Sequence, residues 1–178
     1  MALKPTIYKL KIDLSDMDRA VYETLNLTVA RHPSETLERM MVRVMAYAFN
    51  AQPQLTFCKG LSDTDEPDIW LHSLGGELEL WIDVGEPAAE RIKKATRQAK
   101  RVKVFSFNSK ATTWWELNQH SFAPLPASIL HFPWLQIQAL ANLVERTMEL
   151  SITISDGSAY VATAQGECEV SLQVLQGP

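Results

Sequence analysis

Apolar and polar residues alternate along the first thirty residues, which is the period-two pattern of strands with one buried face. Within residues 6–14, one face of such a strand carries Tyr8, Leu10, Ile12 and Leu14. Residues 21–30 repeat the alternation, and the polar stretch between the two runs can reverse the chain. We therefore predict an N-terminal β-hairpin.

The sequence His32-Pro33-Ser34-Glu35 is typical of a helix start. Ser34 can cap the first turn, and Glu35 suits the positive end of the helix dipole. Leu37, Met41, Val44 and Ala48 form an apolar stripe, so a helix is predicted to run to about Asn50.

Beyond this helix the pattern predicts strands at 55–58, 68–73 and 77–84, a helix from Pro87 to about Lys100, and a strand at 102–107. The tripeptide Leu74-Gly75-Gly76 favours a hairpin between the second and third of these strands. The order from Glu35 to Phe107 is therefore α-β-β-β-α-β.

In the rest of the chain, the pattern of apolar and polar residues predicts a short helix at 112–120, a strand at 129–132 and an amphipathic helix at 133–148. Asp156-Gly157 is a strong turn dipeptide between two further strands. Val170, Leu172 and Val174 alternate in a last strand. We predict a mixed α/β fold in a single domain over 1–178, with a core at about 32–108 and flanking β structure at 5–31 and 128–175.

Composition narrows the class of protein. A chain of 178 residues with 46% hydrophobic residues can bury a sizeable core, and its two cysteines form no spaced metal motif. The N-terminus lacks an apolar stretch of signal-peptide length, and no run approaches the ~20 apolar residues that cross a bilayer. We expect a cytoplasmic protein without membrane contact.

The formal net charge is −4, which disfavours coating of nucleic acid by bulk charge. One stretch, 91–110, nevertheless contains eight basic residues and no acid. It offers candidate contacts to the phosphates of DNA or RNA, and the candidates are Arg91, Lys93, Lys94, Arg97, Lys100 and Arg101. The plain alternative is a solvated helix face, in which Lys94 pairs with Glu90.

Two aspartates in the predicted Gly75-Gly76 hairpin are candidate metal ligands. Fourteen residues separate Asp68 from Asp83, and a hairpin can bring them together. Paired carboxylates bind Mg²⁺ or Mn²⁺, and such an ion activates water and neutralises charge on a phosphate. The plain alternatives are a strand-start residue for Asp68 and a cap of the helix near Pro87 for Asp83.

Six short stretches carry a resemblance to a known family. They are His32-Pro33-Ser34-Glu35-Thr36, Glu38-Arg39-Met40, Glu66-Pro67-Asp68, Trp81-Ile82-Asp83-Val84-Gly85, Arg91-Ile92-Lys93-Lys94-Ala95 and Phe107-Asn108-Ser109. Through them the chain resembles the YaeQ family of bacterial proteins, and the likeness runs from the first residues to the last predicted strand.

The α-β-β-β-α-β order, with Pro67-Asp68 followed by Asp83 on the next strand, also resembles the PD-(D/E)XK nucleases. This resemblance implies a restriction-endonuclease-like core with additional N- and C-terminal strands and a helix in the C-terminal half. It implies Mg²⁺ or Mn²⁺ at Asp68 and Asp83. One departure is that Gly85 stands where the pattern has lysine. Lys94 on the following helix is the first substitute as a catalytic cation, with Arg91 behind it.

The same resemblance implies a further metal ligand from the first helix. Glu38 is favoured, because it flanks the apolar stripe and has no basic residue three or four positions on. Glu35 is the second choice, because it lies on the polar face and can pair with Arg39.

Three functions stay open at this point, and the sequence leaves undecided whether the protein is an enzyme. The first is a Mg²⁺- or Mn²⁺-dependent phosphodiesterase acting on DNA or RNA. The second is a nuclease fold that has lost catalysis and retains nucleic-acid binding. The third is a protein-interaction or regulatory module, related to transcription, that uses exposed sheet edges together with Trp114 and Trp115.

Overall fold

The computed structural model describes residues 4–59, 61 and 63–178, and the chain divides into two compact units. Unit 1 comprises the chain up to Ala51 together with Pro133–Leu172, and unit 2 comprises Gln52–Phe132 together with Gln173–Pro178. The predicted core of 32–108 draws on both units, because its first helix belongs to unit 1 and its strands to unit 2. A single domain over 1–178 stays a prediction.

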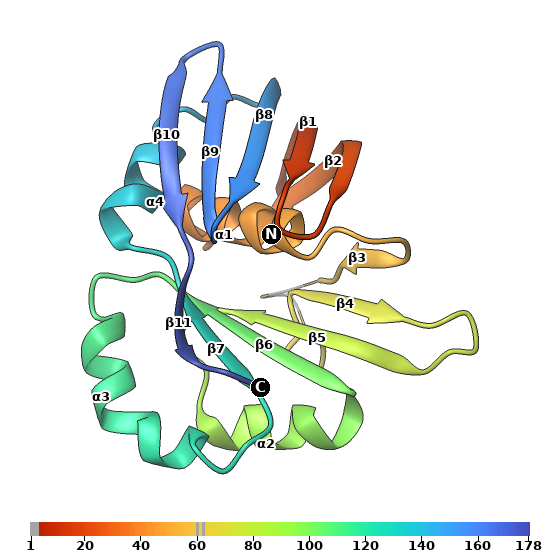
Figure 1. Ribbon diagram of the computed structural model, residues 1–178, viewed down its shortest axis with the longest axis vertical. Coiled ribbons are helices and arrows are strands. Elements are labelled where there is room, and N and C mark those ends of the chain that lie inside the picture. Colours follow the sequence, from red (N-terminus) through yellow and green to blue (C-terminus); the bar gives the residue numbers. More distant parts are fainter. Residues whose placement is uncertain (1–3, 60, 62) are drawn as a thin grey trace. The chain divides into compact units, whose positions relative to one another are not determined.

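Unit 1 contains a five-stranded sheet and two helices (Figure 1). The strands are β1 (Thr6–Asp16), β2 (Val21–Arg31), β8 (Thr147–Ser155), β9 (Ser158–Thr163) and β10 (Gly166–Ser171), and the helices are α1 (Leu37–Phe49) and α4 (Trp134–Ala141). The strand order is β10-β9-β8-β1-β2. β1 and β2 form the predicted hairpin, and β8 runs parallel to β1.

The alternation along β1 separates a buried face from a solvent face. Tyr8, Leu10, Ile12 and Leu14 are at most 6% exposed. Their polar neighbours Lys9, Lys11 and Asp13 are exposed. Since a buried leucine or isoleucine contributes about 1.5–3 kcal/mol, this face is a main source of the stability of unit 1.

Helix α1 begins two residues later than the sequence predicts. Thr36, not Ser34, is the N-cap, and its hydroxyl oxygen accepts a hydrogen bond from the backbone N–H of Arg39 at 3.1 Å. The Ser34 hydroxyl instead lies 2.7 Å from Nδ1 of His32. The threonine takes the cap because its oxygen reaches a free N–H of the first turn.

Unit 2 contains a six-stranded sheet and two helices (Figure 1). The strands are β3 (Leu55–Phe57), β4 (Ile69–His72), β5 (Leu78–Val84), β6 (Arg101–Ser106), β7 (Ser128–His131) and β11 (Gln173–Gln176), and the helices are α2 (Ala89–Gln98) and α3 (Ala111–Phe122). The strand order is β11-β7-β6-β5-β4-β3, with β5, β6 and β7 parallel. The chain order α1-β3-β4-β5-α2-β6 is the predicted one.

The apolar cluster of unit 2 lies between the sheet and its two helices. It contains Trp81 of β5, Ile92 of α2 and Phe122 of α3, with Val102, Val104 and Ile129. Because β5 is an interior strand, all its residues from Leu80 to Val84 are buried. The carboxylate of Asp83 therefore lies in the interior of unit 2.

Two predicted elements in the C-terminal part are wrong. The helix predicted at 133–148 ends at Ala141, and β8 begins at Thr147. The last strand is two strands, because β10 ends at Ser171 in the sheet of unit 1 and β11 begins at Gln173 in the sheet of unit 2. None of the helices in the described part of the chain is long and apolar enough to cross a membrane.

The predicted turn at Asp156-Gly157 is confirmed. Both residues have positive φ, +52° and +75°, as a type I′ hairpin turn requires. The carboxylate of Asp18 accepts hydrogen bonds from both backbone N–H groups, at 2.8 and 2.9 Å. These two hydrogen bonds connect the turn of the β1–β2 hairpin to the turn of the β8–β9 hairpin.

Replacing Thr36 with alanine tests the position of the α1 cap. Thr36→Ala is expected to lower the free energy of unfolding by roughly 0.5–2 kcal/mol, because a first-turn N–H loses its acceptor. Ser34→Ala is the matched control and is expected to change it by less than about 0.5 kcal/mol. Urea denaturation followed by circular dichroism measures both. A larger loss from Ser34→Ala would contradict the assignment.

Candidate functional site

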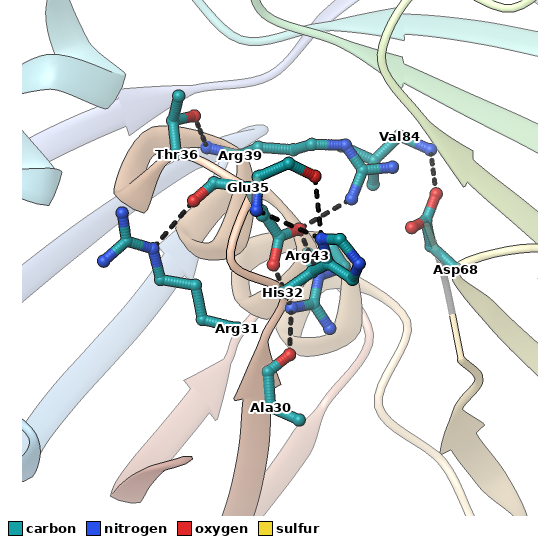
Figure 2. A network of polar contacts seen from close by, with 10 residues as sticks. Ala30, Arg31, His32, Glu35, Thr36, Arg39, Arg43, Asp68 and Val84 are labelled. Atoms are coloured by element: carbon teal, nitrogen blue, oxygen red, sulfur yellow. Dashed lines mark hydrogen bonds and ion pairs between the residues drawn. The ribbon is translucent and has the colours of Figure 1, made fainter. Parts of the chain in front are cut away.

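The β4–β5 hairpin brings Asp68 and Asp83 together, as the sequence predicts. Ile69 lies opposite Ile82, so the next pair along the ladder is Asp68 and Asp83. The two residues are only 5% and 3% exposed. Oδ2 of Asp68 accepts a hydrogen bond from the Val84 backbone N–H at 2.8 Å (Figure 2).

Arg91, in the first turn of α2, is the cation that holds Asp83. Its Nε–H donates to Oδ2 of Asp83 at 2.7 Å, and its Nη2 lies 3.3 Å from Oδ1. The same guanidinium donates to the backbone carbonyls of Thr64 and Glu66. It also lies 5.6 Å from the centre of the Trp81 ring, within the range of a cation–π contact. Arg91 thus joins α2, β5 and the acidic segment 64–66.

The charges at this centre oppose one another. Burial raises the pKa of Asp83 above its ordinary value, and the hydrogen bond from Arg91 acts to lower it. The neighbouring Asp68 raises it further. The Trp81 indole N–H lowers it, although this buried group makes no hydrogen bond of regular geometry within the described chain. For Arg91, the hydrogen bond to Asp83 is the main cause of a raised pKa.

The thiol of Cys58 lies close enough to the carboxylates of this centre to be affected by their negative charge. Burial raises the pKa of its thiol, and the charges of Glu66, Asp68 and Asp83 raise it further. A thiol with a raised pKa is a poor nucleophile and a poor metal ligand at neutral pH. Cys58 is half-buried, and its backbone N–H donates to the Asp68 carbonyl at 2.9 Å.

Lys94, the first choice for the catalytic cation, lies one turn beyond Arg91 and is exposed. In the part of the chain that the structure describes, it forms no ion pair with Asp68 or Asp83, nor with Glu90. It lines a cavity of about 330 Å³ together with Thr64, Asp65, Trp81, Glu90, Arg91, Ala95 and Gln98. The cation that reaches Asp83 is Arg91, the second choice.

Glu35 lies before α1 rather than on its polar face, and it is buried with 3% exposure. Its carboxylate accepts hydrogen bonds from Arg39 at 2.7 Å and from Arg43 at 2.6 and 2.9 Å (Figure 2). Arg43 also donates to the carbonyl of Ala30. The predicted Glu35–Arg39 pair forms, and a second arginine four residues further on joins it.

Glu38 is half-buried in the first turn of α1. It belongs to unit 1 with Glu35, whereas Asp68 and Asp83 belong to unit 2. A ligand set that combines Glu38 or Glu35 with the two aspartates stays a prediction.

Asp68 and Asp83 do not make up a complete site for a divalent ion by themselves. Both oxygens of Asp83 face Arg91, and an oxygen of Asp68 accepts the Val84 N–H. Across residues 4–59, 61 and 63–178, no group of three or more His, Cys, Asp or Glu side chains is placed to hold a metal ion. A divalent ion at Asp83 would have to share this carboxylate with Arg91.

The predicted basic stretch divides into two sets. Arg91 is engaged as described, and Lys100 pairs with Glu77 at 2.7 Å and with Glu79 at 3.0 Å. The remaining candidates are exposed and form no ion pair with any acid in the described chain; we refer to Lys93, Lys94, Arg97 and Arg101 as the exposed cation set.

The tryptophans proposed for protein interaction are partly buried in unit 2. Trp114 and Trp115 each contact Phe122, with ring centres 5.5 and 5.9 Å apart. Both are partly buried against the apolar cluster. These two rings stabilise α3 against the sheet.

The fold and the site describe a mixed α/β protein with a buried aspartate centre held by arginine. The chain belongs to the YaeQ family, since the family model described as "YaeQ protein" matches residues 1–172. Uncharacterized YaeQ proteins of Salmonella typhi and Escherichia coli K12 are each 41% identical to it, over 180 and 182 residues, and each match covers the whole chain and 99% of the relative.

Two solved structures are similar over almost the whole chain. The crystal structure of the YaeQ protein from Xanthomonas axonopodis pv. citri has a TM-score of 0.94 at 35% identity, covering 98% of this chain and 99% of that one. The YaeQ protein from Pseudomonas syringae has a TM-score of 0.93 at 39% identity, covering 98% and 97%. The two sheets and four helices of the described residues thus share the fold of these two YaeQ crystal structures.

Removing Arg91 tests the coupling between the arginine and the buried aspartate. Arg91→Met is expected to lower the free energy of unfolding by about 2 kcal/mol near pH 7, less than for a fully buried pair because Arg91 is one-third exposed. The loss is expected to shrink toward acid pH. The pKa of Asp83 is already raised in the folded protein, so its ionisation costs stability as pH rises, and losing Arg91 enlarges that cost.

The matched control is Lys94→Met, which removes an exposed cation one turn away. It is expected to change the free energy of unfolding by less than about 0.5 kcal/mol, with no dependence on pH. Urea denaturation at several pH values between acid and neutral measures both variants. An Arg91→Met loss that is the same at every pH would rule out Asp83 as its cause.

Proposed function

We propose that this chain is a nucleic-acid-binding protein on a nuclease-like framework, whose central aspartate is held by Arg91 rather than by a resident metal ion. The observation that carries the proposal is the division of the basic stretch. Arg91 and Lys100 form ion pairs with acids of the same chain, whereas the exposed cation set forms none with the described acids. Cations without acidic partners on a chain with net charge −4 are available to an external polyanion.

The spacing of these cations suits a phosphate backbone. Lys93 and Lys94 each lie three or four residues from Arg97 on α2, so their Cβ atoms are about 5–6 Å apart along one side of the helix. Contacts of this kind position a nucleic acid without reading its sequence. We therefore expect binding to single-stranded and duplex DNA and to RNA that depends strongly on salt and weakly on base sequence.

The nuclease-like part of the proposal rests on the chain order and on the paired aspartates. The order α1-β3-β4-β5-α2-β6 and the meeting of Asp68 with Asp83 at the hairpin support it. Gly85 in place of the lysine, and Arg91 on Asp83, argue against catalysis at this centre. We derive no hydrolytic step from the aspartates.

A metal-dependent phosphodiesterase is the alternative function, favoured by the mutual proximity of the two buried carboxylates. Mg²⁺ and Mn²⁺ prefer such anionic oxygens. In this alternative Asp68 and Asp83 would hold the divalent ion, which would supply activation of water and neutralisation of charge on the phosphate.

Binding of a fluorescent single-stranded DNA oligonucleotide, measured by anisotropy over a range of salt, tests the proposal. Lys93→Ala/Lys94→Ala/Arg97→Ala is expected to weaken binding and to reduce the slope of log K against log salt by about 2, since each phosphate contact on a single strand contributes about 0.7. The matched control is Lys4→Ala/Lys9→Ala/Lys11→Ala, which removes three exposed cations of unit 1 and changes the net charge equally.

If the slope of log K against log salt is the same for the wild type and Lys93→Ala/Lys94→Ala/Arg97→Ala, then α2 is not the binding surface. Repeating the assay with Mn²⁺ separates the two functions. Cleavage by the wild type that Asp83→Asn abolishes would establish the phosphodiesterase. Binding without cleavage is the result that the proposal expects.

A further inference from the structure

The two outer strands of the unit 1 sheet differ in how well their edges are protected. β10 spans six residues and carries two acids, Glu167 and Glu169. β2 spans eleven residues, contains no proline, and pairs with β1 without a register shift along its whole length. Its two charges, Glu23 and Arg31, lie toward its ends. Long, regular edges of this kind pair readily with another strand, and proteins usually blunt them.

The backbone groups on the outer edge of β2 can be assigned from the ladder. The Lys9 N–H donates to the Arg146 carbonyl at 2.8 Å, and the Met17 N–H donates to the Ile154 carbonyl, so odd-numbered residues of β1 face β8. The even-numbered residues of β1 therefore bond to β2. Their opposite residues in β2, such as Val29 and Leu27, are odd-numbered.

It follows that the even-numbered residues of β2 direct their N–H and C=O groups away from the sheet. Only the Ala30 carbonyl among these has a partner in the described chain, the Arg43 guanidinium at 2.9 Å. The side chains of Tyr22, Thr24, Asn26 and Thr28 are exposed. An open row of donors and acceptors extends from Tyr22 to Thr28.

We propose that β2 pairs in antiparallel fashion with β2 of a second copy of this chain, about a two-fold axis at Asn26. In this register Asn26 lies opposite its own copy, Thr24 opposite Thr28, and Tyr22 opposite Ala30. Asn26, Thr24 and Thr28 have open outward-facing backbone groups, so they form the hydrogen-bonded pairs of the new ladder. The ladder ends at Tyr22, because the carbonyl of Ala30 already accepts a hydrogen bond from Arg43. The two five-stranded sheets become one ten-stranded sheet, with an isologous contact.

The side chains are self-complementary in this register. Leu25 lies opposite Leu27 on the buried face, which extends the apolar layer across the junction. Glu23 lies opposite Val29 and diagonal to Arg31 of the second copy, on the same face, within reach of long side chains. No like charges lie opposite each other. This complementarity favours a second copy over an unrelated extended peptide as the partner.

Sedimentation velocity over a range of protein concentration tests the pairing. The wild type is expected to approach twice the chain mass of 20.0 kDa in the micromolar range. Asn26→Lys is expected to stay a monomer, because two lysines meet at the axis, while folding is unaffected because the side chain is exposed. Ser151→Lys is the matched control, on the exposed face of an interior strand, and is expected to dimerise as the wild type does.

A cysteine at the axis gives an independent test. In a background with Cys58 and Cys168 replaced by serine, Asn26→Cys is expected to form a covalent dimer on mild oxidation, because hydrogen-bonded pairs place their Cα atoms about 5.5 Å apart. Ser151→Cys is expected to stay monomeric. A wild type that is monomeric at every concentration, or a dimer that Asn26→Lys leaves intact and Asn26→Cys does not cross-link, would overturn the proposal.

Discussion

The burial of Asp83 is the constraint on which the centre of unit 2 depends. A carboxylate that is 3% exposed must be neutralised or paired, since an isolated ionised group in a protein interior costs several kcal/mol. Arg91 meets this requirement with a two-pronged contact, and its remaining donors reach the carbonyls of Thr64 and Glu66. One guanidinium thereby fixes a helix, a strand and an acidic segment together. The same contact engages both oxygens of Asp83, so a divalent ion there would compete with the guanidinium.

Much of the fold follows from local patterns in the sequence. The alternation in β1 and β2, the Asp156-Gly157 turn and the α-β-β-β-α-β order could all be predicted, because each depends on neighbouring residues. The helix at 133–148 was overextended because Met148 fits a helical stripe as well as the strand it belongs to. The division between β10 and β11 could not be predicted, since the apolar alternation continues through Leu172 while the chain changes sheets.

The pairing of the two aspartates could be predicted from the sequence, but the identity of the cation that contacts Asp83 could not. A hairpin register suffices to bring Asp68 opposite Asp83. The sequence favoured Lys94 over Arg91, because it shows which residues flank the buried stripe of α2 but not how α2 lies against β5. Glu35 shows the same limit. Its spacing to Arg39 indicated one ion pair, but the burial that recruits Arg43 depends on the packing of α1. Roles that depend on distant packing are the ones that the pattern does not determine.

The most direct test of the account is a calorimetric titration of Mn²⁺ into the wild type, Asp83→Asn, Arg91→Met and Arg91→Met/Asp83→Asn. If Arg91 holds Asp83 in place of a metal, the wild type takes up no Mn²⁺ at this centre. Arg91→Met then gains a site, and the double variant loses it again. Binding of Mn²⁺ by the wild type that Asp83→Asn abolishes would contradict the account, because the aspartate would then hold a metal with the arginine present.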